Sequence, residues 1–552
     1  MNREGIAAAR GLAPADSVYT NCEIFNPFAC TWEKTGLAVK DGLVVGLGEY
    51  TGRKEVDCGG ARIVPGLIDA HVHIESLLLT PAEYARLVLR HGTTTVVADP
   101  HEIANVCGSA GIEYILRESG ATPLDILVML PSCVPATPMD RGGAVLGPED
   151  LRAFVGRDGV IGLGEMMNVP GVLAGDGEVA EKLDLCAIVD GHAPLLSGKD
   201  LNAYMYAGID SDHECTQLPE GREKLLRGMY VMMREGSTER NLRELVPLVD
   251  ACTAPRCCFA TDDRHVDMLL GAGHIDDCIR KAIFYGCEPE IALRMATLSA
   301  AERFGLHDRG ALAPGRIADF CILDDCETFR VARTFKRGIE VVDPGYRAPA
   351  ALRRPPVARL PVPGDLAIAG EGVARVVGLV PGQIMTEDLR FAVAGASLPD
   401  TGRDILKAVV TDRYRGSGFG VGLVHGFGLL TGALASSVSH DSHNIVAVGA
   451  DDGAIVRAIA EVAGLGGGMA AVSDGAVTSL PLDCAGLMST LPYDEVARRL
   501  ADLEEHARSL GAVANPFMYL SFLALTVIPH LRVTERGVFD VDAFADVPLF
   551  VP

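Results

Sequence analysis

Short apolar runs recur between residues 64 and 262, and each gap between them has room for one helix. One intervening segment opens with Thr80-Pro81-Ala82-Glu83, a capping-box pattern with proline at the first helical position. Eight alternating strand and helix units in roughly 200 residues predict a (β/α)8 barrel, with a doubly wound open sheet as the alternative. The runs are LIDAHVH (67–73), TTTVVAD (93–99), DILVMLP (125–131), VIGLGE (160–165), CAIVDGH (186–192), AGIDSDH (207–213), MYVMMR (229–234) and CCFATD (257–262).

The segments on either side of the barrel have a different pattern. Residues 16–60 are typical of short strands, with a hairpin signal at Lys40-Asp41-Gly42, and residues 310–325 return to strand-like sequence. Proline and arginine are concentrated in 343–364, which is typical of a linker. The predicted division is a small β domain from 1–62 and 310–345, a barrel from 63–309, a linker from 346–364 and a C-terminal α/β domain from 365–552.

Charge and composition exclude several classes of protein. The formal net charge is −24, which argues against nucleic acid or an anionic membrane as a partner but not against an uncharged nucleobase. No run of about 18 uncharged apolar residues occurs, and the N-terminus lacks a signal-peptide core, so neither a membrane span nor secretion is predicted. Fifteen cysteines without any C-x-x-C spacing indicate reduced thiols, and therefore a cytoplasmic protein.

Several of the predicted strands end in histidine or a carboxylate. In a barrel, catalytic side chains come from the C-terminal ends of several strands, so these residues are expected to converge at one mouth. Strand alternation also places the first two histidines on the same side. The set is His71, His73, Glu165, His192, His213 and Asp262.

Neutral imidazole and carboxylate together bind zinc, iron or manganese. Six such residues exceed the needs of one catalytic ion, but suit two ions about 3.5–4 Å apart with a bridging carboxylate and a bridging hydroxide. Glu165 is the natural bridge because its strand lies opposite the first. A single histidine at a strand end is more often structural than a metal ligand. The prediction of a metal site therefore rests on all six residues together. Glu75 adds an H-x-E triplet, but the P-C-x-x-C of the zinc nucleotide deaminases is missing, so that fold is rejected.

Longer stretches resemble the adenine deaminase family of the amidohydrolase superfamily, and the resemblance covers nearly the whole chain. In the barrel these stretches are PGLIDAHVHIES, HGTTTVVADPHEIANVCG (91–108), VMLPSCVPAT, GEMMNVPGV, DGHAPLLSGKDLNAY, SDHE (211–214), GMYVMMREGS and TDDRH (261–265). SSVSHDSHN (436–444) and SLPLDCAGLMS (479–489) are similar to the family's C-terminal domain. As departures, Leu77 and Leu78 follow Ser76, and Val266 stands where the family usually has proline.

The resemblance implies an amidohydrolase-type (β/α)8 barrel with a small β-sandwich domain built from the segments that flank it. It also implies hydrolysis of adenine to hypoxanthine and ammonia in purine salvage, by a hydroxide bridging two Mn²⁺ or Fe²⁺ ions. Zn²⁺ also suits the ligands. By position, the six residues above match the family's ligand set. Asp262 would carry the hydroxide proton toward the leaving amine, and Glu214 would protonate a ring nitrogen; the alternative for Glu214 is to orient His213.

Further polar residues are candidates for the substrate site. His101 and Glu102 match the family's DPHE segment, and either line the mouth or cap a helix. Arg234 is a candidate for substrate binding, with a plain ion pair as the alternative, and Asp263 is another candidate. The cluster His440, Asp441 and His443 could reach a neighbouring active site or hold another ion, although we favour a turn motif.

Two other functions remain open at this stage. One is a related hydrolase acting on N6-substituted adenine, another amino-purine or a cyclic amide, because ligand residues do not report the substrate. The other is a non-catalytic purine-binding paralogue, against which the intact ligand set speaks. We also expect a homo-oligomer, as is usual for such enzymes.

Overall fold

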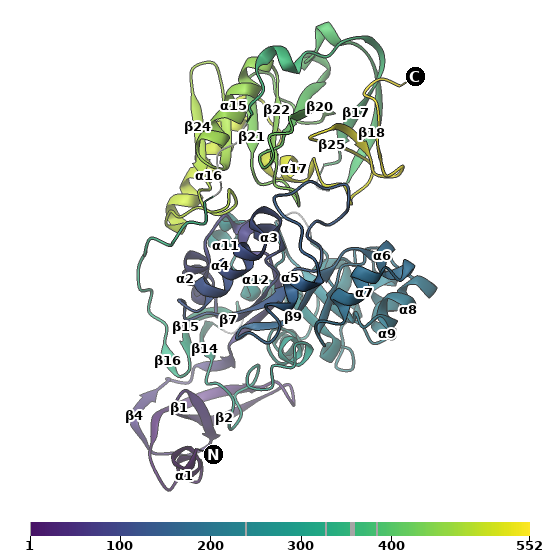
Figure 1. Cartoon of the computed structure of the whole chain (residues 1–552). Coiled ribbons are helices and arrows are strands. Elements are labelled where there is room, and N and C mark those ends of the chain that lie inside the picture. The colour runs from purple at the N-terminus through teal and green to yellow at the C-terminus, as the bar shows by residue number, and fades with distance from the viewer. Residues whose placement is uncertain are drawn as a thin grey trace.

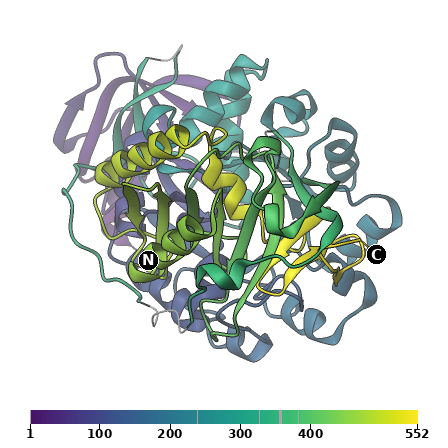
Figure 2. The same cartoon turned by 90° about the horizontal axis from the view of Figure 1, so that it is seen from above.

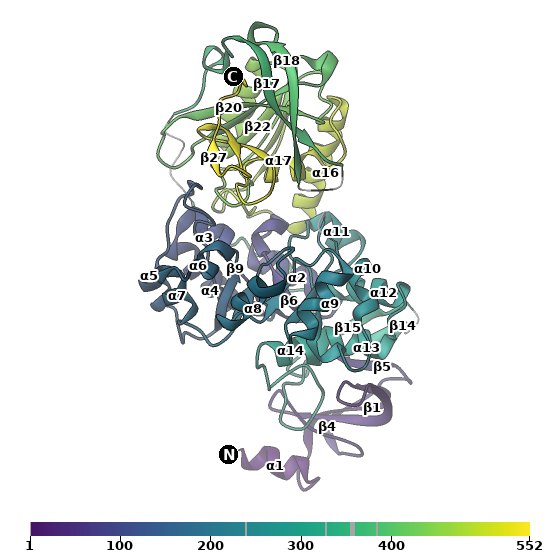
Figure 3. The same cartoon turned by 90° about the vertical axis from the view of Figure 1, so that its right-hand side faces the viewer.

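The computed structural model describes residues 2–237, 240–325, 328–353, 359–381, 383 and 385–551. Three parts are stacked along the molecule: an N-terminal β-sheet at one end, a barrel in the middle and a C-terminal domain at the other end (Figure 1). A view from the side shows the same order (Figure 3). Residues 354–358 of the predicted linker lie outside the described residues.

The barrel strands coincide in position with the eight predicted runs. They pair in parallel and in chain order, as one sheet of five strands and one of three within the described residues. Most strand residues are buried on both faces, which is why the longer strands are mainly apolar, whereas the fifth strand (VDG) and the sixth (SD) are short and polar. The strands are β6 (Leu67–Val72), β7 (Thr93–Ala98), β8 (Asp125–Leu130), β9 (Val160–Met166), β10 (Val189–Gly191), β11 (Ser211–Asp212), β12 (Tyr230–Arg234) and β13 (Cys257–Ala260).

Hydrogen bonds close the two arcs into one barrel. Beyond β13, the Asp262 N–H donates to the His71 carbonyl (3.0 Å) and the His73 N–H donates to the Asp262 carbonyl (3.3 Å), so the last strand returns to the first. Between β10 and β11 a side-chain hydrogen bond takes the place of main-chain strand pairing: the Gly191 N–H donates to Ser211 Oγ (3.2 Å). The (β/α)8 architecture is therefore the correct choice over the open sheet.

Helices connect the strands on the outside of the barrel. The helix after β6 begins at Pro81 as predicted, but Thr80 makes no side-chain cap hydrogen bond, so the predicted capping box is wrong. Glu83 instead accepts from Arg86 and from the Tyr493 N–H (3.0 Å). The helices are α2 (Pro81–Val88), α3 (His101–Cys107), α4 (Ser109–Ser119), α5 (Pro148–Arg152), α6 (Val169–Ala174), α7 (Gly177–Leu183), α8 (Gly198–Tyr206), α9 (Leu218–Leu226), α10 (Leu242–Leu245), α11 (Val266–Gly271), α12 (Ile275–Phe284), α13 (Pro289–Arg294) and α14 (Ala300–Arg303).

The N-terminal sheet combines strands from both sides of the barrel sequence. Strand β14 pairs antiparallel with β5, which leads directly into β6 and so connects this sheet to the barrel. The short helix α1 (Arg3–Ala9) precedes the sheet. Its strands are β1 (Ala15–Asn26), β2 (Thr31–Lys40), β3 (Leu43–Leu47), β4 (Gly52–Asp57), β5 (Arg62–Pro65), β14 (Phe320–Asp325), β15 (Arg330–Lys336) and β16 (Ile339–Glu340).

The C-terminal domain is rich in strands and lies over the barrel when viewed from above (Figure 2). Its large sheet has the order β18-β17-β20-β19-β22-β21-β23-β24 and is accompanied by a three-stranded sheet. The strands are β17 (Glu371–Leu379), β18 (Thr386–Ala394), β19 (Leu406–Thr411), β20 (Phe419–His425), β21 (Ala433–Ser436), β22 (Ile445–Gly449), β23 (Gly468–Val472), β24 (Val477–Pro481), β25 (Leu531–Thr534), β26 (Gly537–Asp540) and β27 (Ala545–Asp546); the helices are α15 (Asp452–Gly464), α16 (Tyr493–Ser509) and α17 (Pro516–Phe522).

One apolar core runs through the contact between barrel and C-terminal domain. Leu87 and Val96 from the barrel belong to the same buried cluster as Leu434, Leu487 and Val496 from the C-terminal domain. Such a shared core holds the domain over the barrel as one packed body. Among the described residues, no helix has both the length and the apolar character needed to cross a membrane.

Candidate metal centre

The six predicted ligands meet at the mouth of the barrel. His71 Nε2 lies 3.1 Å from His73 Nε2, and His73 Nε2 lies 3.1 Å from Asp262 Oδ1. Five of the six side chains are almost completely buried, and the His192 side chain is 24% exposed. Asp262 follows β13 with φ +54°, a left-handed conformation that aspartate adopts more readily than most residues.

Glu165 divides the set into two halves. Its Oε1 faces His73 Nε2 at 3.3 Å and His71 Nε2 at 3.8 Å. Its Oε2 faces the other pair, His192 Nδ1 at 2.7 Å and His213 Nε2 at 3.2 Å. The strand order explains this arrangement, because β9 lies across the mouth from β6 while β10 and β11 follow it around the barrel.

The donor atoms fit a pair of divalent ions. The groups His71–His73–Glu165 and Glu165–His192–His213 each place their ligand atoms within 4.8 Å of one another. Two imidazole nitrogens that face each other at 3.1 Å need a proton or a cation between them, because both otherwise present lone pairs. His73 Nδ1 lies 2.9 Å from the Asp99 carbonyl, which leaves Nε2 for an ion.

Charge interactions at the mouth follow from burial of so many titratable groups. Burial lowers the pKa of His71, and the neighbouring His213 and His73 lower it further. Burial also opposes the charge of His213, but the carboxylate of Glu165 outweighs it and raises the pKa to about 9. Asp262 is likewise buried, yet the Arg234 guanidinium holds its pKa well below the usual range. The centre therefore favours ionised carboxylates, the form that binds metal.

Arg234 and Glu214 form the outer wall of the centre. The Arg234 guanidinium donates to both Glu214 oxygens and, from Nη1, to Asp262 Oδ2 (2.6 Å). Glu214 Oε1 lies 3.5 Å from His213 Nε2 and its side chain is 14% exposed, so it sits where solvent and the metal ligands meet. Glu235 is turned away from the centre and pairs with Lys281 (2.5 Å). Asp263 Oδ1 is buried and has no hydrogen-bond partner in the described structure.

His101 and Glu102 line the side of the mouth that faces the C-terminal domain. His101 Nδ1 lies 3.4 Å from Glu165 Oε1, and its ring meets that of His73 edge-on. Glu102 accepts one bond from His440 Nδ1 and another from His443 Nε2. Both residues lie at the start of α3, but the N-cap residue is Pro100 and no side chain caps the helix, so the alternative that they cap a helix is wrong.

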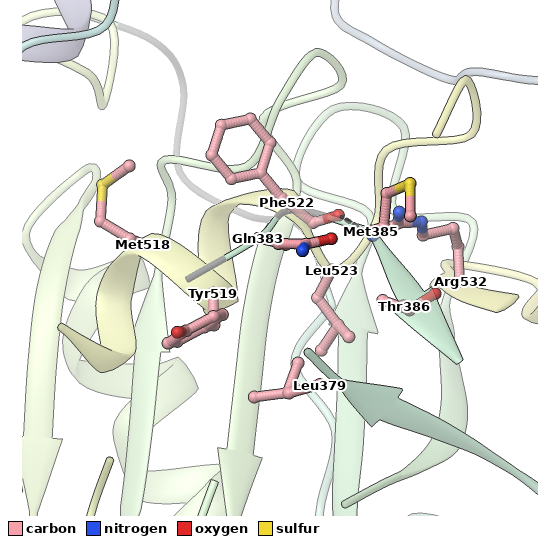
Figure 4. Close-up of a pocket in the computed structure, with 9 residues that line it drawn as sticks. All are labelled: Leu379, Gln383, Met385, Thr386, Met518, Tyr519, Phe522, Leu523 and Arg532. Atoms are coloured by element: carbon pink, nitrogen blue, oxygen red, sulfur yellow. Dashed lines mark hydrogen bonds between the residues drawn. The ribbon is translucent and has the colours of Figure 1, made fainter. Parts of the chain in front are cut away.

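Two residues of the histidine cluster, His440 and Asp441, lie in a turn that reaches the barrel mouth of its own chain. Glu102, His440 and His443 also bring three possible ligand atoms within 4.8 Å of one another. Phe522, at the end of α17, stacks on the His440 ring with centroids 4.7 Å apart. Met518, Tyr519 and Phe522 also line a pocket in this domain (Figure 4). Its cavity volume of about 10 Å³ holds no more than a water molecule, so the pocket serves packing and not ligand binding.

Some residues of the site were not singled out from the sequence, and the structure identifies them. Asp99 Oδ2 accepts the Glu165 N–H (2.9 Å), and Asp69 accepts from Thr261. Asn241 donates to the His213 carbonyl (2.9 Å) and accepts the Arg234 N–H (2.6 Å). Asp99 could have been found, because it ends the second apolar run as the ligands end theirs.

Comparison with known proteins places the chain in a class. The amidohydrolase family model matches residues 62–341, and the adenine deaminase C-terminal domain model matches residues 383–545. The chain is thus a hydrolase of the amidohydrolase family.

Full-length relatives narrow the class. An adenine deaminase from Methanoculleus marisnigri is 73% identical over 93% of this chain and 99% of its own, and one from Methanoregula boonei is 60% identical over 99% and 98%. The chain belongs to the adenine deaminase family. Among solved structures, molinate hydrolase has a TM-score of 0.47 and 16% identity over 63% of this chain and 99% of its own.

Proposed function

We propose that the protein is an adenine deaminase that hydrolyses adenine to hypoxanthine and ammonia at the barrel mouth. The observation that carries the proposal is Glu165, whose two oxygens face two separate groups of ligand atoms. His71, His73 and Asp262 would hold one divalent ion and His192 and His213 the other, with Glu165 between them. Bound there, the pair supplies an activated water for hydrolysis near neutral pH.

The remaining steps fall to side chains around the ions. Asp262 would accept the proton of the attacking water and return it to the leaving amine, since Arg234 fixes its second oxygen. Attack at C6 builds negative charge on the ring, so Glu214, at the solvent side of the ligands, would protonate a ring nitrogen. His101, Glu102 and Asp263 are proposed to line the substrate space. Arg234 is assigned to positioning, because its described bonds go to Glu214 and Asp262.

The cellular setting is also part of the proposal. Mn²⁺ or Fe²⁺ is the expected metal, and Zn²⁺ suits the same donors. Every cysteine in the described residues is a free thiol, which supports a reducing cytoplasmic compartment. The proposed reaction would serve purine salvage. We further propose a homo-oligomer, as is usual for such enzymes. The net charge of −24 supports the absence of nucleic-acid partners.

Ammonia release from adenine tests the function directly. Protein purified with Mn²⁺ should release ammonia, and Glu165→Ala should lose both the activity and bound metal. Glu505→Ala, at a side chain 72% exposed on α16, is the matched control and should behave as wild type. Absence of ammonia from a protein that holds two metals per chain would exclude adenine as the substrate and direct attention to N6-substituted purines.

A further inference from the structure

A clamp between domains brings Asp441 to the barrel mouth. On one side of Asp441, His440 donates to a Glu102 oxygen, and two residues beyond it His443 bonds the other oxygen of the same carboxylate. The His440 N–H also donates to the Ser521 carbonyl (2.8 Å), so the turn is fixed to its own domain as well. The position of Asp441 is therefore determined from both domains.

One imidazole ring separates Asp441 from the metal ligands. His101 Nε2 lies 3.9 Å from Asp441 Oδ1, and Nδ1 of the same ring lies 3.4 Å from Glu165 Oε1. The His101 ring fills the space between Glu165 and Asp441, so Asp441 lies one ring width from the proposed ligands. A purine that presents C6 to the metal centre would lie alongside this ring, with its far edge toward Asp441.

Asp441 is buried at 5% exposure, yet its hydrogen-bonding capacity is unused. Oδ2 has no partner among the described residues, and the 3.9 Å between Oδ1 and His101 is too long for a hydrogen bond. Nearby, His101 Nδ1 and Asp263 Oδ1 are also buried without partners. Buried polar groups are almost always satisfied, so this concentration of unpaired atoms at one mouth indicates a polar ligand.

The chemistry of adenine identifies which atoms would meet this carboxyl. The edge opposite C6 carries N3, an acceptor, next to N9–H, a donor. A carboxyl group can accept from N9–H with one oxygen and donate to N3 from the other when it is protonated. Burial, reinforced by the charge of Glu102, raises the pKa of Asp441 to about 7, which makes the protonated form available at neutral pH.

We propose that Asp441 is a substrate-recognition residue that binds the N3–N9 edge of the purine and thereby selects the free base over N9-substituted purines. The inference rests on the proposed deaminase function. It assigns to the C-terminal domain a direct part in specificity, in addition to covering the mouth.

The test compares adenine with 9-methyladenine, which lacks the N9 proton. Wild type should prefer adenine strongly in kcat/KM, and Asp441→Ala should reduce this preference by about tenfold or more, because the bond is lost and space for the methyl group appears. Asp441→Asn should retain most of the preference, since an amide keeps one donor and one acceptor. In isothermal titration calorimetry with metal-loaded protein, the ratio of the two purines' dissociation constants should rank wild type, Asp441→Asn and Asp441→Ala in the same order.

The controls separate recognition from damage to the fold. Asp404→Ala removes a carboxylate whose described hydrogen bonds, to the Gly426 and Gly428 N–H groups, are all within the C-terminal domain, and it should leave the preference unchanged. Metal content should equal wild type in every variant. An unchanged preference in Asp441→Ala, or an Asn variant that behaves like Ala, would overturn the proposal. If wild type releases no ammonia but binds adenine selectively, and Asp441→Ala abolishes that selectivity, the proposed deaminase function fails and the proposed recognition role of Asp441 stands.

Discussion

Gly164 is the residue that allows Asp99 to reach the main chain of Glu165. A Cβ at this position would lie 2.1 Å from Asp99 Oδ2, which accepts the Glu165 N–H. We predict that Gly164→Ala displaces Asp99, weakens metal retention and lowers kcat/KM about 10- to 100-fold. Gly177→Ala, where a Cβ meets nothing within 4 Å, is the matched control. Metal analysis and steady-state kinetics check both; full activity with full metal in Gly164→Ala would refute the explanation.

The pKa of Asp441 predicts how stability depends on pH. An acid whose pKa is raised by folding binds its proton more tightly in the folded state, so its contribution to stability is lost as pH rises from the ordinary aspartate value toward 7. Wild type should therefore lose thermal stability relative to Asp441→Asn between pH 5 and pH 8, on the order of a few kcal/mol. Melting temperatures of the two metal-loaded proteins across this range measure it. A difference that stays constant with pH would contradict the assignment.

At the scale of residues, the sequence predicted what strand periodicity can place. His71, His73, Glu165, His192, His213 and Asp262 stand at strand ends, and the structure gathers all of them. The contact of Glu102 with His440 could not be predicted from the sequence, because the two residues are 338 positions apart and no local pattern relates them. Asn241 was missed for a similar reason, since its role depends on a loop conformation.

Among the elements, α9 is fixed to β11 by a buried lysine. Lys224 Nζ donates to Asp212 Oδ2 (2.9 Å), Glu220 Oε1 (2.8 Å) and the Ala193 carbonyl (2.6 Å), and it is fully buried. Removing one partner leaves an uncompensated charge, so Lys224→Ala should destabilise the protein by about 3–5 kcal/mol. Denaturant unfolding measures the change, with the exposed Lys199→Ala as control. Equal free energies of unfolding for the two variants would show that the buried contacts of Lys224 do not contribute to stability.

Strand positions were predictable, whereas strand lengths were not. The run AGIDSDH contains β11, but only Ser211 and Asp212 are assigned to the strand. Arg303 explains the shortening, since its guanidinium donates to the Val189 carbonyl (2.9 Å) and Ser211 Oγ (3.1 Å) and thus replaces main-chain pairing between β10 and β11. Apolar periodicity reports burial but does not report which group satisfies a buried carbonyl.

For the whole molecule, the shared core predicts cooperative unfolding. Residues of α2 and α16 belong to one buried cluster, and Arg90 Nη1 donates to the Tyr493 hydroxyl (2.9 Å) across the same contact. The barrel and the C-terminal domain should therefore melt together in a single calorimetric transition, and a chelator should shift that transition to lower temperature as a whole. Two resolved transitions, with only one moved by the chelator, would mean that the domains are energetically independent.

The separation between Glu102 and its histidine partners also has a consequence for biosynthesis. The last proposed metal ligand, Asp262, leaves the ribosome well before His443, and at usual elongation rates the interval is roughly ten to forty seconds. During that interval a nascent barrel would present its ligands without the domain that later covers them. Because the barrel is translated first, metal ions can reach its ligands during this interval, before the C-terminal domain is synthesised and covers the barrel mouth.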